Sequence, residues 1–287
     1  MALTSQVRVR LNRILSSINV QVETLTKRRL ECERLRAFHA AGRFERPVFK
    51  ILQSFPSCKA DSFEDALRRY ASAIKRLEEE VGNEVGYTID NTWFTSPDAE
   101  IYYVLIRTSR PQSIIEVGSG FSTKIARQAI RDAGLSTVLT SIDPEPRSGI
   151  DALCDVVIRK PLQTTDAAVW SRGLQANDII FIDSSHEVKI GNDVVFIFSE
   201  ILDELAPGVL VHFHDIFLPF EYPLEWAEIF DPMWSDQYLV QVLLQFSDRF
   251  DVVWPGHYLQ RMDPNFAARF PTLRQGRAQS LWLRKLK

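Results

Sequence analysis

The sequence predicts a doubly wound, Rossmann-like α/β domain that follows an all-helical N-terminal extension. After Gly86, short apolar runs rich in β-branched residues alternate with stretches of helical periodicity, which is typical of βαβ units and a mostly parallel sheet. One such run, 113–117, leads into a glycine-rich bend and then into a helical stretch, as in nucleotide-binding folds. Before Gly86 we find only helical periodicity. We therefore expect a helical extension over 1–85 and one α/β domain over 86–287.

The extension contains two predicted helices. The first carries an apolar stripe in steps of four and three residues, formed by Leu11, Leu15, Ile18, Val22 and Leu25. This spacing fits either the seam of a coiled-coil homodimer or a helix packed on its own domain. The second begins near Ser62, which we expect to cap it, and its apolar face consists of Phe63, Leu67, Tyr70, Ile74 and Leu77.

Seven strands are expected in the second part of the chain. Their ranges are 113–117, 138–142, 155–158, 178–182, 208–213, 250–254 and 280–285. A helix from about Asn192 should bury its apolar residues between the fourth and fifth strands. It should end at Pro207-Gly208, because this pair cannot continue a helix.

The composition narrows the choice of partners and compartment. The 34 basic and 37 acidic residues give a net charge of -3, so the charge balance gives no reason to expect a nucleic-acid partner. No apolar run reaches the roughly 18 residues of a membrane span, and no signal peptide is apparent. Cys32, Cys58 and Cys154 are odd in number and widely spaced, which indicates a reducing compartment. We expect a cytoplasmic protein with neither a membrane nor a nucleic-acid partner.

The bend at 118–120 predicts a nucleoside ligand that carries a positive charge. In an open α/β sheet, ligands bind beyond the carboxyl ends of the strands. Asp143 ends the second strand, where it could accept hydrogen bonds from ribose hydroxyls. A dinucleotide site would have a third glycine at position 123, where this chain has Thr123. Glu116 would also repel a pyrophosphate but could organise a cationic amino-acid group.

Three segments together resemble a known family. "IIEVGSG", "SIDPE" and "DIIFIDSSH" are similar to the first, second and fourth motifs of the class I S-adenosylmethionine-dependent methyltransferases, and the resemblance runs from about Asn91 to the C-terminus. It implies a seven-stranded sheet with an antiparallel last strand, and S-adenosylmethionine as cofactor. The cofactor contacts that it implies are Glu116, Gly118, Ser119, Gly120, Ser122, Thr123, Asp143, Leu162, Gln163 and Asp183.

Histidines and aspartates collect at the ends of the fourth and fifth strands. Asp183 and His186 follow the fourth strand, and His214 and Asp215 follow the fifth, while His212 lies deeper and is expected in the core. Either His186 or His214 could take the proton of a methyl acceptor as a general base, oriented by Asp183 or Asp215. The second interpretation is a divalent metal held by Asp183, His214 and Asp215, which would suit a transition metal.

The leading hypothesis is in-line methyl transfer to a small molecule, at oxygen, with a histidine as the base. Phe217, Tyr222 and Trp226 are candidates for an apolar wall near the acceptor. The alternatives are a nucleoside-binding interaction protein without catalysis, and a protein methyltransferase. The acceptor itself is not encoded by any motif in the chain.

Overall fold

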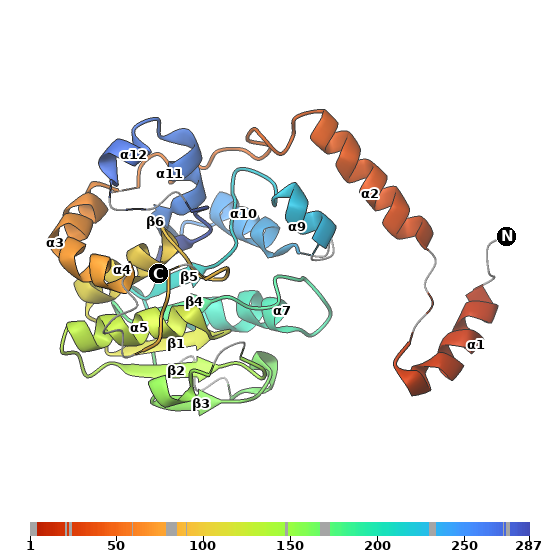
Figure 1. Ribbon diagram of the computed structural model, residues 1–287, viewed down its shortest axis with the longest axis horizontal. Helices are drawn as coiled ribbons and strands as arrows, with labels where there is room; N and C mark the ends of the chain where they lie inside the picture. Colours follow the sequence, from red (N-terminus) through yellow and green to blue (C-terminus); the bar gives the residue numbers. More distant parts are fainter. Residues whose placement is uncertain are drawn as a thin grey trace. The chain divides into compact units, whose positions relative to one another are not determined.

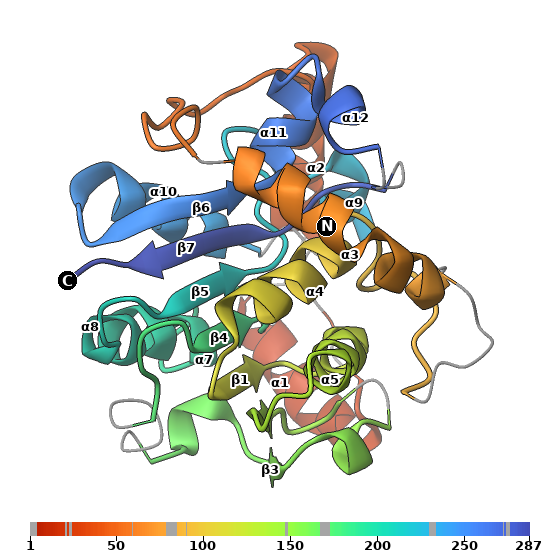
Figure 2. The same cartoon turned by 90° about the vertical axis from the view of Figure 1, so that its left-hand side faces the viewer.

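A seven-stranded sheet lies at the centre of the larger part of the chain (Figure 1, Figure 2). The computed structural model describes residues 5–20, 22, 25–58, 60–78, 85–89, 91–146, 149–166, 173–229, 234–271, 273 and 276–287. The strands are β1 (Ser113–Val117), β2 (Val138–Ile142), β3 (Val156–Ile158), β4 (Ile179–Ile182), β5 (Leu210–Phe213), β6 (Phe250–Pro255) and β7 (Leu281–Lys285). Every predicted strand is confirmed, with ends that differ by at most two residues.

The strand order is β3-β2-β1-β4-β5-β7-β6. Strands β1 to β5 pair in parallel, and β7 runs antiparallel to both β5 and β6, so the expected antiparallel last strand is confirmed. The chain leaves β1 toward β2 and β3, then returns to place β4 on the other side of β1. In this register Val117 lies opposite both Ile142 and Ile182, so the three strands end together at the position where such folds bind ligands.

Helices cover both faces of the sheet, because alternate strand residues bury apolar side chains on opposite sides. On one face lie α3 (Asp61–Glu78), α4 (Asp98–Ser109) and α5 (Phe121–Asp132), packed against Ile114 and Phe181. On the other lie α7 (Asp193–Phe196), a π-helical segment (Ile197–Ile201), α8 (Leu202–Glu204) and α10 (Asp236–Phe246), packed against Ile115 and Ile180. The short elements are η2 (Asp151–Leu153), η3 (Leu162–Thr164), α11 (Gly256–Met262) and α12 (Phe266–Arg269).

The helix predicted from Asn192 is present, although its middle is π-helical. The Asn192 side chain accepts a hydrogen bond from the Val195 backbone N–H at 3.2 Å and so caps α7. The run ends at Glu204, shortly before Pro207-Gly208 as expected.

The predicted apolar face of α3 is also buried, with Phe63, Leu67, Ile74 and Leu77 each at most 6% exposed. The helix starts at Asp61, so Ser62 lies inside its first turn and does not cap it. Phe63 contacts Trp254 of β6 with ring centroids 4.9 Å apart. The larger compact unit comprises residues 49–220 and 233–287, so α3 belongs to it and not to a separate helical extension.

The smaller unit comprises residues 1–48 and 221–232, with α1 (Ser5–Leu15), η1 (Ser16–Ile18), α2 (Leu25–Ala40) and α9 (Leu224–Ile229). The prediction of one continuous stripe from Leu11 to Leu25 is wrong. The α-helix stops at Leu15, Asn19 adopts a left-handed φ of 55°, and the Asn12 side chain exchanges hydrogen bonds with the Val22 backbone at 2.7 and 2.9 Å. These bonds hold the chain in a turn. Residues 21, 23 and 24 of the stripe region lie outside the described residues.

Within the described parts of the chain, no helix combines the length and the apolar character that crossing a membrane requires.

Candidate active site

The glycine bend after β1 is required by a close approach of two strand ends. Gly118 has a φ of +78°, and an ideal Cβ at this position would lie 1.8 Å from the carbonyl oxygen of Asp183, which follows β4. No side chain fits there. Gly118 therefore allows the ends of β1 and β4 to meet.

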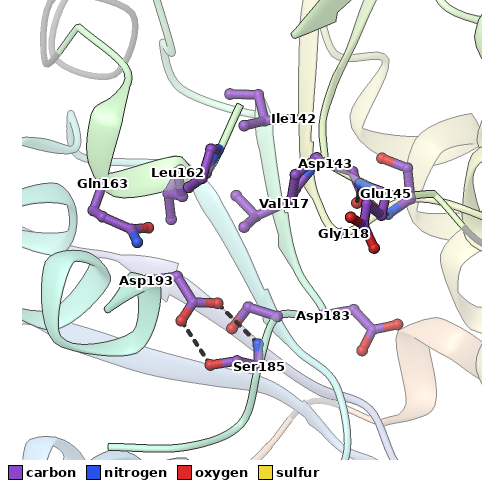
Figure 3. Close-up of a pocket in the computed structure, with 14 residues that line it drawn as sticks. Val117, Gly118, Ile142, Asp143, Glu145, Leu162, Gln163, Asp183, Ser185 and Asp193 are labelled. Atoms are coloured by element: carbon purple, nitrogen blue, oxygen red, sulfur yellow. Dashed lines mark hydrogen bonds between the residues drawn. The ribbon is translucent and has the colours of Figure 1, made fainter. Parts of the chain in front are cut away.

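A pocket of about 330 Å³ lies beside this bend (Figure 3), within the range of small-molecule sites. Its walls are Val117, Gly118, Ser119, Ile142, Asp143, Pro144, Glu145, Pro161, Leu162, Gln163, Asp183, Ser184, Ser185 and Asp193. Six of the expected cofactor residues are therefore brought together, namely Gly118, Ser119, Asp143, Leu162, Gln163 and Asp183. The other four, Glu116, Gly120, Ser122 and Thr123, are not among the residues that line it.

Asp143 connects the second strand to the bend. One of its carboxylate oxygens accepts a hydrogen bond from the Ser119 backbone N–H at 2.9 Å, and the other accepts one from the Glu145 N–H at 2.8 Å. Each oxygen retains a second lone pair, and Asp143 lines the pocket. The Ser141 hydroxyl also bonds to the Ser119 hydroxyl at 2.8 Å. The bend is thus fixed while Asp143 can still accept further hydrogen bonds.

Glu116 lies beneath the bend and is fully buried. Its carboxylate accepts hydrogen bonds from the Tyr102 hydroxyl at 3.2 Å and from the Thr123 hydroxyl at 2.5 Å. The Thr123 hydroxyl in turn accepts one from the Gly120 N–H at 3.0 Å. Burial raises the pKa of Glu116 to about 7. These contacts support the bend from the core, and Glu116 is not among the residues that line the pocket.

Asp193 is a pocket residue that the sequence analysis missed. Its carboxylate accepts hydrogen bonds from the Ser185 N–H at 2.9 Å and the Ser185 hydroxyl at 2.6 Å (Figure 3). This pair connects the start of α7 to the β4 tip. An aspartate directly after the helix cap Asn192 was the available signal, since it places a carboxylate at the carboxyl edge of the sheet.

A cluster of acidic and histidine side chains adjoins the pocket at the β4 and β5 tips. Asp183, His186 and Asp215 each offer one ligand atom, and these atoms lie within 4.8 Å of one another. His186 Nε2 is 3.1 Å from Asp183 Oδ1 and 3.5 Å from Asp215 Oδ2. We refer to these three residues as the tip cluster. It shares Asp183 and Asp215 with the predicted metal set and contains His186 where the prediction had His214.

Residues 115–216 match a family model described as a methyltransferase domain. The chain carries a methyltransferase domain of class I fold. The match starts in β1 and ends just after the β5 tip, so it spans the described pocket and the tip cluster. A search of curated proteins gave no match.

Solved methyltransferase structures are similar to this chain at low identity. SAH-bound methyltransferase PaMTH1 from Podospora anserina is 15% identical, over 78% of this chain and 88% of that one, with a TM-score of 0.43. The O-methyltransferase from Bacillus cereus in complex with SAH is also 15% identical, over 78% and 91%, with a TM-score of 0.43.

Within the methyltransferase domain, His186 is surrounded by negative charge. Its Nδ1 lies 3.0 Å from Asp236 Oδ2 at the start of α10, opposite the side that faces Asp183 and Asp215. Burial alone would lower the pKa of His186, but the charges and hydrogen bonds of Asp236, Asp183 and Asp215 raise that pKa well above its ordinary value. A neutral imidazole base is therefore disfavoured here. The centre of the tip cluster instead favours a positive charge.

His214 and His212 have different surroundings in the methyltransferase domain. His214 is 3% exposed, its Nδ1 is 3.5 Å from Asp215 Oδ1, and neither ring nitrogen has a hydrogen-bond partner among the described residues. His212 stacks on Phe181 at 3.8 Å and bonds to the Ser280 hydroxyl at 2.8 Å. His212 is thus a core residue, as predicted.

The three residues of the predicted apolar wall fall in different compact units. Phe217 is fully buried and packs against His257, with ring centroids 5.2 Å apart, so it belongs to the core. Tyr222 and Trp226 belong to the smaller compact unit.

Proposed function

We propose that this chain transfers a methyl group from S-adenosylmethionine to a hydroxyl oxygen of a small molecule. The observation that carries the proposal is the double position of Asp183, which lines the pocket and also belongs to the tip cluster. A donor in the pocket and an acceptor at the tip cluster would therefore be neighbours, as methyl transfer requires.

The pocket has the chemistry that S-adenosylmethionine needs. Asp143 keeps lone pairs for two ribose hydroxyls, while the Gly118 backbone lies at the same edge. Leu162 and Gln163 lie on the opposite side of the pocket (Figure 3). There an apolar side chain and an amide could contact the face and the polar edge of an adenine.

The donor set of the tip cluster fits a divalent cation, because two carboxylates and one imidazole converge on one point. When bound, such a cation would lower the pKa of an acceptor hydroxyl. Asp183 is 34% exposed at its side chain, against 6% for His186 and 9% for Asp215. We therefore assign Asp183 to the side of the cation that the acceptor approaches. His186 and Asp215 would bind the cation from its buried side.

The acceptor proton needs a separate group, since both nitrogens of His186 are engaged. We assign that role to His214, whose ring nitrogens lack hydrogen-bond partners within the described residues. This keeps the histidine base of the sequence hypothesis but selects one of its two candidates.

Labelled S-adenosylmethionine tests the proposal when it is incubated with the protein and a panel of hydroxylated small molecules. We expect label on an acceptor oxygen, and a loss of about 100-fold or more in Asp215→Asn with cofactor binding retained. Asp248→Asn is the matched control, because Asp248 is 83% exposed and pairs with Lys287 at the surface. Cofactor binding without any transfer would favour a non-catalytic interaction protein.

Chelation separates the two forms of the mechanism. We expect a chelator to abolish transfer and an added divalent ion to restore it. Full activity in chelator, together with a loss in His214→Ala, would leave the histidine base acting alone.

We further propose a cytoplasmic location, since Cys32, Cys58 and Cys154 are all free thiols. Cell fractionation tests this, and recovery from an oxidising compartment would contradict it.

A further inference from the structure

His186 is held at both ring nitrogens by carboxylates on opposite sides. Nδ1 lies 3.0 Å from Asp236 Oδ2, and Nε2 lies 3.1 Å from Asp183 Oδ1. A carboxylate can only accept, so both ring nitrogens donate when no cation is bound, Nδ1 to Asp236 and Nε2 to Asp183. A cation in the tip cluster would displace the proton on Nε2, while Asp236 keeps the proton on Nδ1. An outer carboxylate on the second imidazole nitrogen is what orients histidines that bind metals.

The backbone around His186 fixes the ring further. His186 has a left-handed φ of 59°, and its carbonyl accepts hydrogen bonds from the backbone N–H groups of Ser235 at 2.7 Å and Asp236 at 3.2 Å. The Trp234 ring lies against the imidazole, with centroids 4.4 Å apart. A strained residue maintained by its neighbours is typical of a functional position.

A second observation points to a ligand at this place. His214 is 97% buried, lacks hydrogen-bond partners at both ring nitrogens within the described residues, and directs Nδ1 toward Asp215 at 3.5 Å. A buried imidazole without a partner is costly unless something else satisfies it. On the far side of Asp215, the Gln279 amide donates to Oδ1 at 2.7 Å and fixes that carboxylate.

From these contacts we infer that the tip cluster selects a transition-metal dication such as Co²⁺, Zn²⁺ or Fe²⁺ over Mg²⁺, and that Asp236 is the positioning residue for this choice. Mg²⁺ prefers an all-oxygen octahedral shell, whereas an imidazole nitrogen suits the later first-row metals. The inference rests on the proposed function only in assigning a divalent cation to the tip cluster. The metal test below needs neither S-adenosylmethionine nor an acceptor.

Co²⁺ is the probe, because it reports its ligands by visible absorption and by paramagnetically shifted proton resonances. We expect Co²⁺ to bind the full chain with one shifted imidazole N–H resonance, which belongs to the Nδ1 proton held by Asp236. We also expect Mg²⁺ to compete at least about 100-fold more weakly. The inference is overturned if Co²⁺ binds without an imidazole resonance, if it does not bind, or if Mg²⁺ competes equally.

Asp236→Asn tests the positioning role, since asparagine keeps the shape but loses the charge. We expect Co²⁺ affinity to fall about 10-fold to 100-fold and the N–H resonance to be lost to solvent exchange, while Mg²⁺ affinity changes little. Asp248→Asn should match the wild type in every measurement. Unchanged Co²⁺ affinity in a folded Asp236→Asn protein would remove Asp236 from the role. Competition between Mg²⁺ and Co²⁺ for the wild-type protein tests the metal preference even if Asp236→Asn does not fold.

Discussion

Gly118→Ala is the substitution for which the structure gives the most direct prediction. The new Cβ would lie 1.8 Å from the Asp183 carbonyl oxygen and 2.8 Å from its carbonyl carbon, whereas real Cβ atoms essentially never approach closer than 3.0 Å. The two strand tips must therefore separate by about 1.2 Å (3.0 less 1.8). Because the obstacle is backbone, a side-chain rotation cannot relieve the clash.

The cost has two parts. Alanine at a left-handed φ costs about 1–2 kcal/mol, and forcing extra volume into a packed contact costs about 1–3 kcal/mol. We expect the free energy of unfolding to fall by about 2–5 kcal/mol. Asp183 would also move relative to the pocket, and a misplacement of about 1 Å can reduce catalysis about 100-fold. Denaturant unfolding measures the first effect, and calorimetry with S-adenosylmethionine measures how far the pocket is disturbed.

Gly120→Ala is the control within the same bend. Gly120 has an extended φ of 173°, and nothing lies within 4 Å of the Cβ that would be added. Its free energy of unfolding should change by less than about 1 kcal/mol. If Gly118→Ala were as stable as Gly120→Ala and bound cofactor equally well, the close contact between the β1 and β4 tips would not exist as described.

Three further predictions concern the cofactor, the core and assembly. Asp143→Ala should weaken S-adenosylmethionine binding by about 2–3 kcal/mol, the value of hydrogen bonds to a charged group, and unchanged affinity by calorimetry would remove Asp143 from the ribose site. The pKa of Glu116 is about 7 in the folded protein, against 4.5 for an ordinary glutamate. The protonated carboxyl therefore contributes its full stabilisation below pH 4.5, and this stabilisation is lost as the pH rises through 7. At about 1.4 kcal/mol per pKa unit, this loss amounts to about 3 kcal/mol between pH 4.5 and pH 8. Glu116→Gln lacks this titration, so its free energy of unfolding minus that of the wild type should rise by the same amount over that range. A difference that stays constant with pH would refute the raised pKa of Glu116. If α1 and α2, as two separate helices, hold the homodimer expected from the sequence, deleting residues 1–40 should convert it into a monomer that still binds cofactor, and a full-length monomer in sedimentation would contradict the dimer.

The sequence alone determined the sheet. Its strands are buried on both faces, so each appears as a short apolar run bounded by turn residues, such as "SIIEV" before Gly118. The bend and the place of Asp143 beside it could also be predicted, because parallel strands end at one edge and the residues after them must meet there. These features depend on the local pattern of apolar and turn residues, which can be recognised in the sequence.

Only the tertiary structure decided the chemistry at the β4 and β5 tips. Sequence placed both His186 and His214 at this edge, but the structure shows that His186 contacts both Asp183 and Asp215, whereas His214 contacts Asp215. Asp236, fifty positions along the chain from His186, has no local signal for its role. Glu116 was expected in the pocket, but packing placed its carboxylate beneath the bend. Side-chain direction after a strand end is set by contacts between distant segments, and the order of residues along the chain does not specify them.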